Sequence, residues 1–288
     1  MQIASLFETK NTVLSFEVFP PKKTSSIDTI YSTLDQLKDL KPDFISVTYG
    51  AGGNAGDTLT CDIASTIKQK YQIEPLAHLT CVNYTKQEIL SILERLEQHG
   101  IENILALRGD INPGVEPKHE FRYASDLVAF IRARGGFHVS GACYPEGHVS
   151  SENLIDDILN LKHKVEEGAE HLISQLFFDN NYFYSFLEKA RIAGINVPIE
   201  AGIMPVVNKA QIERMVTLCG ASLPPKFTKM LQRFEHSPEA LRDAGIAYAI
   251  DQIVDLISQG VDGIHLYTMN NPYIAKKISE SIAGLINA

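Results

Sequence analysis

Residues 14–22 read LSFEVFPPK, a predicted strand that carries one carboxylate among apolar side chains. Alternation along the strand puts Ser15, Glu17 and Phe19 on one face, and the two prolines that follow end it. A lone glutamate at such a position is ordinarily a salt-bridged residue on an edge strand. Because later strands repeat the polar pattern, Glu17 is also a candidate functional group.

Strand-like apolar runs recur at intervals of about 25 to 35 residues, and each is followed by a helix-like segment, which is the spacing of βα units. The expected strands lie at residues 14–19, 44–49, 75–81, 101–107, 138–143, 171–177, 197–203 and 263–268. The expected helices lie at residues 26–40, 58–71, 85–99, 124–134, 151–168, 182–193, 209–219, 225–234, 238–259 and 272–286. Thr85 and Glu88 form a predicted capping box at the start of the third helix.

This order predicts an α/β protein, a (β/α)8 TIM barrel in which residues 1–288 form a single domain. The segment 209–259 is expected as a helical insertion before the last strand. A doubly wound parallel sheet is the alternative, because repetition alone does not prove closure. Polar residues inside the strands favour the barrel, since an open sheet covered by helices on both faces is more continuously apolar. The residues that share the pore-facing parity are Ser15, Glu17, Ser46, Thr48, His78, Thr80, Ser140, Gln175, His265 and Tyr267.

The composition narrows the function classes. A formal charge of -9 and a pI near 5.5, without a Lys/Arg run, argue against a nucleic-acid partner. The four cysteines show no CxxC spacing, so neither a disulfide framework nor a standard zinc site is expected. The N-terminus lacks a basic region followed by a long apolar core, and no apolar run approaches the roughly 18 residues of a membrane span. We therefore expect a cytoplasmic protein that binds neither nucleic acid nor membrane.

Two short motifs suggest ligand contacts. Residues 50–55, GAGGNA, resemble a dinucleotide fingerprint, but the acidic residue needed at the end of the next strand is missing, because Glu74 lies at that strand's beginning. A loop whose glycines let a flat ligand approach is favoured. His78 and Cys81 suggest a metal, yet they point to opposite faces, which favours a histidine that hydrogen-bonds a ligand or is satisfied internally.

Residues 105–110, LALRGD, place an arginine and an aspartate directly after a strand. A surface ion pair in a turn is the plain alternative. At the catalytic face of a barrel, Arg108 can instead bind a phosphate through two hydrogen bonds. Asp110 can there accept a hydrogen bond from a ring N–H or tune the electronics of a cofactor.

The chain resembles the methylenetetrahydrofolate reductases over about residues 12–285, nearly its whole length. The motifs that carry the resemblance, in the same order and at similar spacing, are FEVFPPK, SVTYGAGG, AHLTC, ALRGD, YASDL, YPEGH, LNLKHKVEEGA, QLFFD, GIMPV and LYTMNN. The resemblance implies a (β/α)8 barrel with non-covalent FAD, which reduces 5,10-methylenetetrahydrofolate to 5-methyltetrahydrofolate with NADH or NADPH in a ping-pong cycle. It also implies a homo-oligomer that supplies methyl groups for methionine synthesis. Larger family members append a domain that binds S-adenosylmethionine, and since this chain ends just after the barrel pattern, inhibition by that compound is not expected.

Carried over position by position, the resemblance implies a role for each matching residue. Glu17 is implied as the general acid, with Gln175 and Gln211 on the folate side and Asp110 placed to bind the pterin. The residues implied to contact FAD or the nicotinamide are Thr48, Tyr49, Ala51, His78, Arg108, Gly109, Asp110, Tyr123, Ala124, Tyr144, His148, Asp157, Asn160 and Lys164. The positions that depart from the family pattern are Asn271 for a folate-contacting arginine, Met215 for an aromatic residue and His163 for a basic FAD contact.

The implied chemistry requires Glu17 to carry a proton near neutral pH, because it must protonate N10 of the folate and open the ring that holds the bridging carbon. Its apolar neighbours Phe16, Val18 and Phe19 are expected to favour the protonated form by desolvation, and Asp110 to add like-charge repulsion. Two alternatives from other classes stay open, a metal-dependent barrel hydrolase and a non-catalytic flavin- or pterin-binding module.

Overall fold

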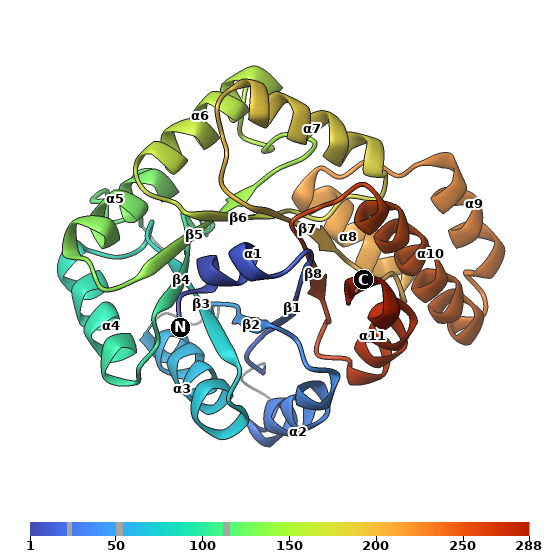
Figure 1. Ribbon diagram of the computed structural model, residues 1–288, viewed down its shortest axis with the longest axis horizontal. Helices are drawn as coiled ribbons and strands as arrows, with labels where there is room; N and C mark the ends of the chain where they lie inside the picture. Colours follow the sequence, from blue (N-terminus) through green and yellow to red (C-terminus); the bar gives the residue numbers. More distant parts are fainter. Residues whose placement is uncertain (22–24, 50–53, 112–115, 288) are drawn as a thin grey trace.

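The computed structural model describes residues 1–21, 25–49, 54–111 and 116–287, whose strands close into a barrel ringed by helices (Figure 1). The strands pair in parallel and in chain order, and β8 pairs with β1 to complete the cylinder. The strands are β1 (Val13–Val18), β2 (Phe44–Val47), β3 (Glu74–Thr80), β4 (Asn103–Leu107), β5 (His138–Cys143), β6 (His171–Ser174), β7 (Ile199–Ile203) and β8 (Gly263–Tyr267). An open doubly wound sheet is therefore excluded, and the (β/α)8 barrel prediction is confirmed.

Helices follow the strands and cover the outside of the barrel (Figure 1). Those that follow β1 to β6 are α2 (Asp28–Leu37) with the 3-10 turn η2 (Lys38–Leu40), α3 (Asn54–Tyr71), α4 (Lys86–Gln98), α5 (Ala124–Arg134), α6 (Leu154–Glu166) and α7 (Asn180–Ile192). The predicted insertion between β7 and β8 consists of α8 (Lys209–Cys219), α9 (Pro225–Phe234) and α10 (Pro238–Ser258). Helix α11 (Pro272–Ile286) follows β8.

Capping residues decide where two of these helices begin. Helix α4 starts at the predicted capping box, in which Glu88 N donates to Thr85 Oγ1 at 3.2 Å and Thr85 N donates to Glu88 Oε2 at 2.7 Å. Helix α6 starts at Leu154 rather than at residue 151. The reason is that Asn153 caps it, with its side-chain oxygen accepting from Asp156 N at 3.0 Å.

Alternation along the strands separates two environments. Outward side chains such as Phe16 and Leu266 are fully buried against the surrounding helices. Inward side chains fill the barrel, where Phe44 belongs to an apolar cluster at the end from which the strands start. Polar residues of the predicted pore-facing parity meet across this interior, as shown by Ser15 Oγ and His265 Nδ1, which lie 2.6 Å apart. The predicted inward orientation is therefore confirmed for these residues.

The N-terminal end of the barrel is closed by a segment for which the sequence pattern predicts no element. The 3-10 turn η1 (Ile3–Ser5) and helix α1 (Leu6–Thr9) lie across this end (Figure 1), and Ile3 is fully buried there. Phe7 packs on the ring of His171 with centroids 4.7 Å apart. The segment is too short to show helical periodicity. Its burial nevertheless shields the interior polar residues from solvent on this side.

The insertion packs as a second apolar cluster beside the barrel. Phe227 of α9 and Leu241 of α10 belong to this cluster, together with residues that follow β6 and β7. Phe227 stacks on Phe178 with ring centroids 4.5 Å apart. Helix α10 approaches the chain after β7 so closely that a Cβ on Gly245 would lie 1.6 Å from the carbonyl oxygen of Val206. A glycine is therefore required at this crossing.

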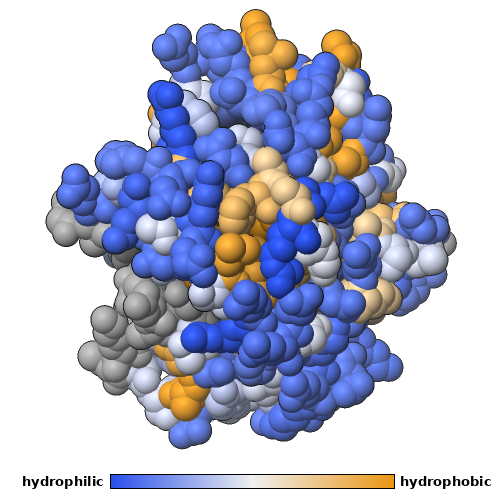
Figure 2. Space-filling view, turned by 90° about the vertical axis from the view of Figure 1, so that its left-hand side faces the viewer, coloured by the Kyte–Doolittle hydropathy of each residue, from blue (hydrophilic) through white to orange (hydrophobic). Residues whose placement is uncertain are grey.

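The exposed apolar residues do not form a large continuous patch on the face shown in Figure 2. Figure 2 shows a face on which hydrophilic side chains dominate and apolar ones are confined to small patches. The exposed large apolar residues come from different elements, for example Ile155 on α6, Ile192 on α7 and Tyr273 on α11. Within the described ranges, no helix combines the length and the apolar composition needed to cross a membrane.

Gly245→Ala should destabilise the fold strongly, because the added methyl group collides with the backbone at Val206 and α10 must shift. We expect the free energy of unfolding, measured by urea denaturation, to fall by about 2 kcal/mol or more. Gly284→Ala is the matched control, since its Cβ would meet nothing within 4 Å and alanine is the better helix former by about 1 kcal/mol. Equal stability of the two variants would contradict the close approach of α10.

Candidate functional site

Glu17 faces the barrel interior from the second half of β1, with its side chain 19% exposed. Its Oε2 lies 3.6 Å from His78 Nε2 on β3 and 3.8 Å from His265 Nε2 on β8. Burial lowers the pKa of His78 to about 4, so this imidazole is neutral at pH 7 and brings no positive charge to Glu17. Glu17 thus lies between two rings that can exchange hydrogen bonds with it, which suits a group that holds and releases a proton.

Two expected neighbours of the Glu17 carboxylate lie elsewhere. Phe16 and Val18 point outward and are fully buried among the helices, because successive side chains of a strand alternate between faces. The carboxylate instead meets the rings of His78 and His265. The expectation that Phe16 and Val18 desolvate Glu17 is therefore wrong, and the packed interior of the barrel surrounds it instead.

The turn after β8 fixes the backbone around Glu17. Thr268 Oγ1 donates a hydrogen bond to the Glu17 carbonyl at 2.6 Å. Asn270 binds the backbone of Phe19 twice, because its Nδ2 donates to Phe19 O at 2.8 Å and its Oδ1 accepts from Phe19 N at 3.0 Å. Met269 and Asn270 hold positive φ angles of 52° and 53°, a conformation that costs about 1 kcal/mol or more for a residue with a side chain. This strained turn therefore positions the strand that carries Glu17.

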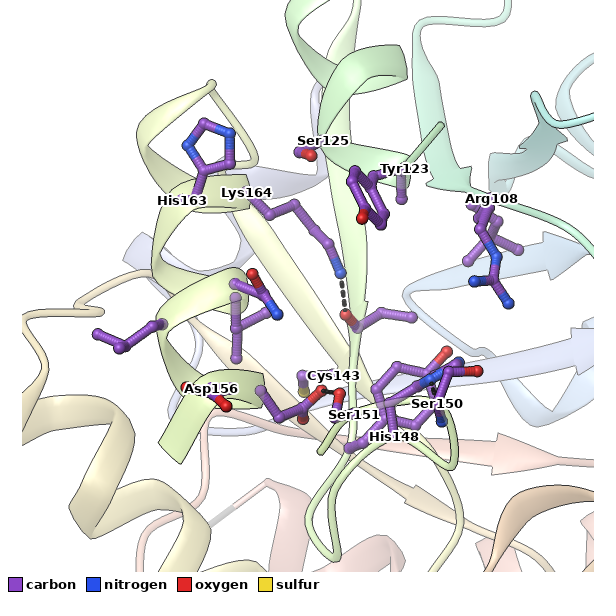
Figure 3. A pocket seen from close by; sticks show the side chains of 18 of the residues that line it. Arg108, Tyr123, Ser125, Cys143, His148, Ser150, Ser151, Asp156, His163 and Lys164 are labelled. Carbon is purple, nitrogen blue, oxygen red and sulfur yellow. Dashed lines mark hydrogen bonds between the residues drawn. The ribbon is translucent and has the colours of Figure 1, made fainter. Parts of the chain in front are cut away.

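A cavity of about 930 Å³ opens beside the carboxyl ends of β4 and β5, between helices α5 and α6 (Figure 3). Residues far apart in the sequence line it, and those that the sequence predicts as cofactor contacts are Arg108, Tyr123, Ala124, Tyr144, His148, Asp157, Asn160 and Lys164. Ligand pockets typically measure roughly 300–1,000 Å³. The cavity is therefore large enough for a ligand of cofactor size.

Lys164 reaches from α6 across the cavity to β5, where its Nζ donates to the Ala142 carbonyl at 2.7 Å (Figure 3). Gly141 leaves room for this path, because a Cβ there would lie 2.8 Å from Lys164 Cδ. Burial lowers the pKa of Lys164, which means that its ammonium group is poorly solvated. A desolvated cation of this kind is stabilised when an anion binds beside it.

Arg108 lies across the cavity from α6, directly after β4 (Figure 3). Its Nε donates to the Gly109 carbonyl at 3.4 Å, and among the described residues its guanidinium forms no ion pair, so the alternative of a surface pair with Asp110 is not realised. Gly109 has a φ of 83°, and a Cβ at this position would lie 2.9 Å from Thr80 Cβ, so the turn behind Arg108 requires glycine. The guanidinium is thus available to a phosphate or a carboxylate.

Uncharged rings and carboxylates line the rest of the cavity. Tyr144 and His148 meet edge to face with ring centroids 4.6 Å apart. Burial raises the pKa of Tyr144 to about 12, while burial and the charge of Arg108 lower the pKa of His148, so neither ring is charged at pH 7. Ser151 Oγ donates to Asp157 Oδ1 at 2.7 Å (Figure 3). The cavity therefore combines two cations with aromatic surface, which suits a ligand with flat rings and an anionic group.

Tyr267 on β8 lies within electrostatic range of both Glu17 and the cavity. Burial raises the pKa of Tyr267, and interactions with Glu17 and with the cavity residues Cys143 and Tyr144 act in the same direction. Its hydroxyl donates to the Ser174 carbonyl at 2.8 Å. Glu17 and the cavity thus belong to one region at the carboxyl ends of the strands, where the active sites of such barrels lie.

Thr48 and Tyr49 follow β2 and lie outside the cavity lining. The Thr48 carbonyl accepts from Thr60 Oγ1 at 3.1 Å, and Tyr49 Oη donates to Tyr84 Oη at 2.7 Å. These bonds anchor the chain just before the glycine-rich stretch at residues 50–55. Ala51 itself lies outside the described residues, so its predicted role stays a prediction.

Asp110, Gln175 and Gln211 also lie outside the cavity lining. Asp110 is exposed, and its charge adds to burial in raising the pKa of Cys219. Gln175 follows β6, with its backbone N–H donating to the Cys143 carbonyl at 2.7 Å. The side chain of Gln211 lies outside the described part of the chain. The folate-side roles of these residues therefore stay predictions.

His78 and Cys81 point to opposite faces of the barrel wall, as the alternation predicts. His78 faces Glu17, whereas Cys81 Sγ lies 3.7 Å from the Tyr123 carbonyl oxygen on the outer side. Burial raises the pKa of the Cys81 thiol to about 12, so it is not a thiolate at neutral pH. The two side chains cannot share a metal ion in this arrangement.

Several residues that line the cavity, some of them inside the family motifs, are not among the predicted cofactor contacts. The additional lining residues include Ser125, Asp126, Cys143, Ser150, Ser151, Glu152, Asp156 and Leu159. Asp156 could have been found from helical periodicity, because it precedes Asn160 and Lys164 by steps of four residues on α6. The residues of the loop after β5 have no such period, and only the fold brings them to the cavity.

Comparison with known proteins assigns the family. The family model described as methylenetetrahydrofolate reductase matches residues 2–283. The chain belongs to the methylenetetrahydrofolate reductase family. It is 36% identical over 270 residues to the 5,10-methylenetetrahydrofolate reductase of Pectobacterium carotovorum subsp. carotovorum, a match that covers 93% of this chain and 89% of that protein. It is also 36% identical over 279 residues to the 5,10-methylenetetrahydrofolate reductase of Escherichia coli (strain K12), covering 96% of this chain and 93% of that protein.

A longer family member is similar in sequence, and a more distant solved structure is similar in fold. Methylenetetrahydrofolate reductase (NADH) 1 of Arabidopsis thaliana is 36% identical over 284 residues, covering 93% of this chain and 48% of that protein. A solved structure of an uncharacterized protein from Clostridium thermocellum, described as binding two copies of 5-methyl-5,6,7,8-tetrahydrofolic acid, superposes with a TM-score of 0.69 at 14% identity. This superposition covers 99% of both chains. At such low identity it supports the fold alone.

Because His78 is buried in its neutral form, the stability of this protein should depend on pH. The pKa of His78 falls from an ordinary value of about 6.5 to about 4 on folding, so between these values the unfolded chain binds a proton that the folded chain does not. Stability therefore rises with pH across this window and is lost as the pH falls toward 4. His78→Gln should lower the slope of the unfolding free energy against pH by up to one proton, as measured by urea denaturation at a series of pH values. An unchanged slope would contradict the neutral burial of His78.

Proposed function

We propose that this protein reduces 5,10-methylenetetrahydrofolate to 5-methyltetrahydrofolate, with FAD as bound cofactor and NADH or NADPH as electron donor. The observation that carries the proposal is the combination, at one end of the barrel, of Glu17 between two histidines and a cavity lined by the predicted cofactor contacts. The 36% identity to 5,10-methylenetetrahydrofolate reductases over most of the chain supports it.

The residues of the cavity fit FAD, which has two flat ring systems joined by an anionic pyrophosphate. Lys164 and Arg108 would hold the anionic part, and Tyr123 and Tyr144 offer aromatic surface to the rings. The lowered pKa of Lys164, caused by burial, supports an anionic ligand because the desolvated ammonium group gains a partner on binding. When bound, FAD carries a hydride from the nicotinamide to the folate.

Glu17 holds the proton that N10 of the folate receives. Protonation of N10 opens the five-membered ring and makes the bridging carbon an electrophile that can accept hydride. His78 is neutral at pH 7 because burial lowers its pKa, so it does not stabilise the carboxylate form of Glu17 electrostatically. The bonds from Thr268 and Asn270 hold this part of β1 in place while the substrate binds.

The proposal includes a ping-pong order, in which the nicotinamide leaves before the folate binds. The position of Glu17 and of the cavity at the same end of the barrel supports this order, because both substrates must reach the same cofactor there. We also propose that residues 1–288 form one catalytic domain and that the protein is a cytoplasmic homo-oligomer. Its product would supply methyl groups for methionine synthesis. The resemblance of the whole chain to the family supports these parts.

Glu17→Gln tests the role of the proton donor, because the amide keeps the shape of the side chain but cannot donate the required proton. We expect unchanged FAD content and unchanged reduction of the flavin by NADH or NADPH. Folate reduction should fall by at least about 100-fold, the lower range for loss of a general acid. Stopped-flow absorbance measures the two half-reactions separately. A folate half-reaction at the wild-type rate would remove Glu17 from the mechanism.

Lys164→Met tests the cofactor site, because methionine fills similar space without the charge. We expect the dissociation constant of FAD to rise about tenfold or more, as for loss of a charge-assisted hydrogen bond. Lys162→Met is the matched control, since Lys162 is 42% exposed on the same helix and lies 3.8 Å from Glu166. Titration of cofactor-free protein with FAD gives both constants. Equal affinity in the two variants would rule out a contact between Lys164 and FAD.

A further inference from the structure

A row of hydroxyl, imidazole and carboxyl side chains crosses the barrel interior from Glu17 toward the N-terminal ends of the strands. The proposed reaction assigns no role to this row. In order from Glu17, the members of this interior row are His265, Ser15, Glu200, His171, Ser140, His138 and Glu170. All members from His265 to His138 are fully buried, whereas Glu170 is 36% exposed at the far end. The row therefore connects Glu17 with solvent at the opposite end of the barrel.

The half of the row next to Glu17 runs through β8, β1 and β7. His265 Nε2 lies 3.8 Å from Glu17 Oε2, and its Nδ1 lies 2.6 Å from Ser15 Oγ. Ser15 Oγ lies 2.8 Å from Glu200 Oε1. Gly263 leaves room for Glu200, because a Cβ there would lie 2.8 Å from Glu200 Cγ. The carboxyl group is thus built into the wall of the barrel.

The other half runs through β6 and β5 to the surface. Glu200 Oε2 lies 3.1 Å from His171 Nε2, and His171 Nδ1 lies 2.9 Å from Ser140 Oγ. Ser140 Oγ lies 3.4 Å from His138 Nε2, and His138 Nδ1 lies 3.0 Å from Glu170 Oε2. Glu170 also pairs with Arg132 on α5 at 2.9 Å, where both side chains reach solvent.

Each histidine of the row and Glu200 face their two neighbours through two different atoms, whereas Ser15 and Ser140 meet both neighbours through Oγ, which can accept one hydrogen bond while it donates another. The three histidines use one ring nitrogen in each direction, and Glu200 uses one carboxyl oxygen in each direction. A group that accepts a proton on one atom and donates from another can pass protons along. Stability alone does not explain such a row, because well-packed apolar residues of similar volume would serve a barrel interior at least as well.

Two contacts in the row are not hydrogen bonds in this structure. His171 Nε2 and Glu200 Oε2 have no hydrogen-bond partner among the described residues although they are 3.1 Å apart. The distance between Glu17 Oε2 and His265 Nε2 is 3.8 Å, whereas direct proton transfer requires about 3.2 Å or less. Small movements of the His171 imidazole, of the Glu17 side chain and of Ser140, whose Oγ lies 3.4 Å from His138 Nε2, are therefore part of the transfer.

We propose that the interior row is a proton relay, which returns a proton from solvent at Glu170 to Glu17 after each folate reduction. The inference rests on the proposed function, in which each turnover consumes one proton together with the hydride of the nicotinamide. Glu17 is only 19% exposed, and a folate whose N10 contacts it covers what is exposed. Protons that reach Glu17 through the barrel interior allow it to regain its proton without contact with bulk water at the carboxyl ends of the strands.

The transfer moves one proton and changes no oxidation state. The Glu17 carboxylate takes the proton on His265 Nε2, while His265 Nδ1 takes that of Ser15 and Ser15 takes that of the Glu200 carboxyl group. Glu200 is refilled through its other oxygen from His171 Nε2. His171 Nδ1 then accepts from Ser140, Ser140 from His138 Nε2, and His138 Nδ1 from Glu170, which takes a proton from water. One proton is thereby removed from solvent and one is added to Glu17, and the imidazole rings, the hydroxyl groups and the Glu200 carboxyl group must then turn back to their starting arrangement before the next transfer.

The protonation equilibria of the row agree with this sequence. Burial raises the pKa of Glu200 to about 7, with the charges of Asp43 and Asp262 acting in the same direction, so its neutral and charged forms are both accessible near neutral pH. Burial and the neighbouring His138 lower the pKa of His171, so this ring is neutral between transfers. The contact with His138 lowers the pKa of Glu170, so this carboxylate carries a proton taken from water only transiently and passes it on to His138.

Two variants test the relay. Glu200→Gln keeps the volume of the side chain but cannot carry the proton, and Ser140→Ala breaks the row at a residue that does not contact Glu17. Glu74→Gln is the control, because Glu74 is a carboxylate at the same end of the barrel that pairs with Lys68 outside the row. The holoenzyme is reduced with NADH and mixed with 5,10-methylenetetrahydrofolate. The rate of this first turnover is compared with steady-state kcat in H₂O and D₂O.

The first turnover uses the proton already on Glu17, so it should proceed at the wild-type rate in all three variants. Steady-state kcat should fall at least tenfold in Glu200→Gln and Ser140→Ala, with a larger solvent isotope effect, and stay unchanged in Glu74→Gln. Wild-type kcat in both row variants would overturn the relay. Equal losses in first and later turnovers would also overturn it, because they indicate a structural role. A wild-type protein that never oxidises NADH or NADPH with this folate would instead contradict the proposed function on which the relay rests.

Discussion

When eight parallel strands close into a cylinder, every second side chain of each strand points into the barrel interior. Polar groups at these positions must form hydrogen bonds with one another. In this chain the inward positions of β1, β5, β6, β7 and β8 carry hydroxyl, imidazole and carboxyl groups, while the outward positions are apolar and pack on the helices. The strand register decides which of these groups meet, and it places Ser15 beside His265 across the closure of the barrel. Both the environment of Glu17 and the interior row depend on that register.

The groups proposed for function are held in unfavourable surroundings. Burial lowers the pKa values of His78 and Lys164 and raises that of Glu200 to about 7, so the folded protein disfavours the charged form of each. The apolar layer between strands and helices offsets this cost, since residues such as Phe16 and Ile104 are fully buried there. Stability thus resides mainly in the outer layer, and the interior is free to carry chemistry. Such a division is common in enzymes, whose active sites trade stability for function.

The sequence predicts the order of elements well because the signals involved are local. Alternation in the strands, the capping box at Thr85 and the insertion before β8 all appear in the structure. Helix α1 is missed because a four-residue helix has no readable period. The surroundings of Glu17 are predicted wrongly where Phe16 is concerned, because a neighbour in sequence lies on the opposite face of a strand.

The candidate site is predictable only in part, for the same physical reason. The cavity residues on α6 share a helical face and match family motifs, so residues such as Lys164 are found from the sequence. The path of Lys164 over Gly141 and the contact between Ser15 and His265, 250 residues apart, depend on tertiary structure. Glu200 shows this most clearly, since its role in the row follows from two contacts that no sequence pattern contains.

The most direct test of the account is the visible absorption spectrum of the purified protein under anaerobic conditions. It is recorded first as isolated with FAD, then after addition of NADH or NADPH, and then after addition of 5,10-methylenetetrahydrofolate. We expect flavin bands that bleach with the nicotinamide and return in full when the folate is added. A protein that takes up no FAD, or whose reduced flavin is not reoxidised by the folate, would contradict it.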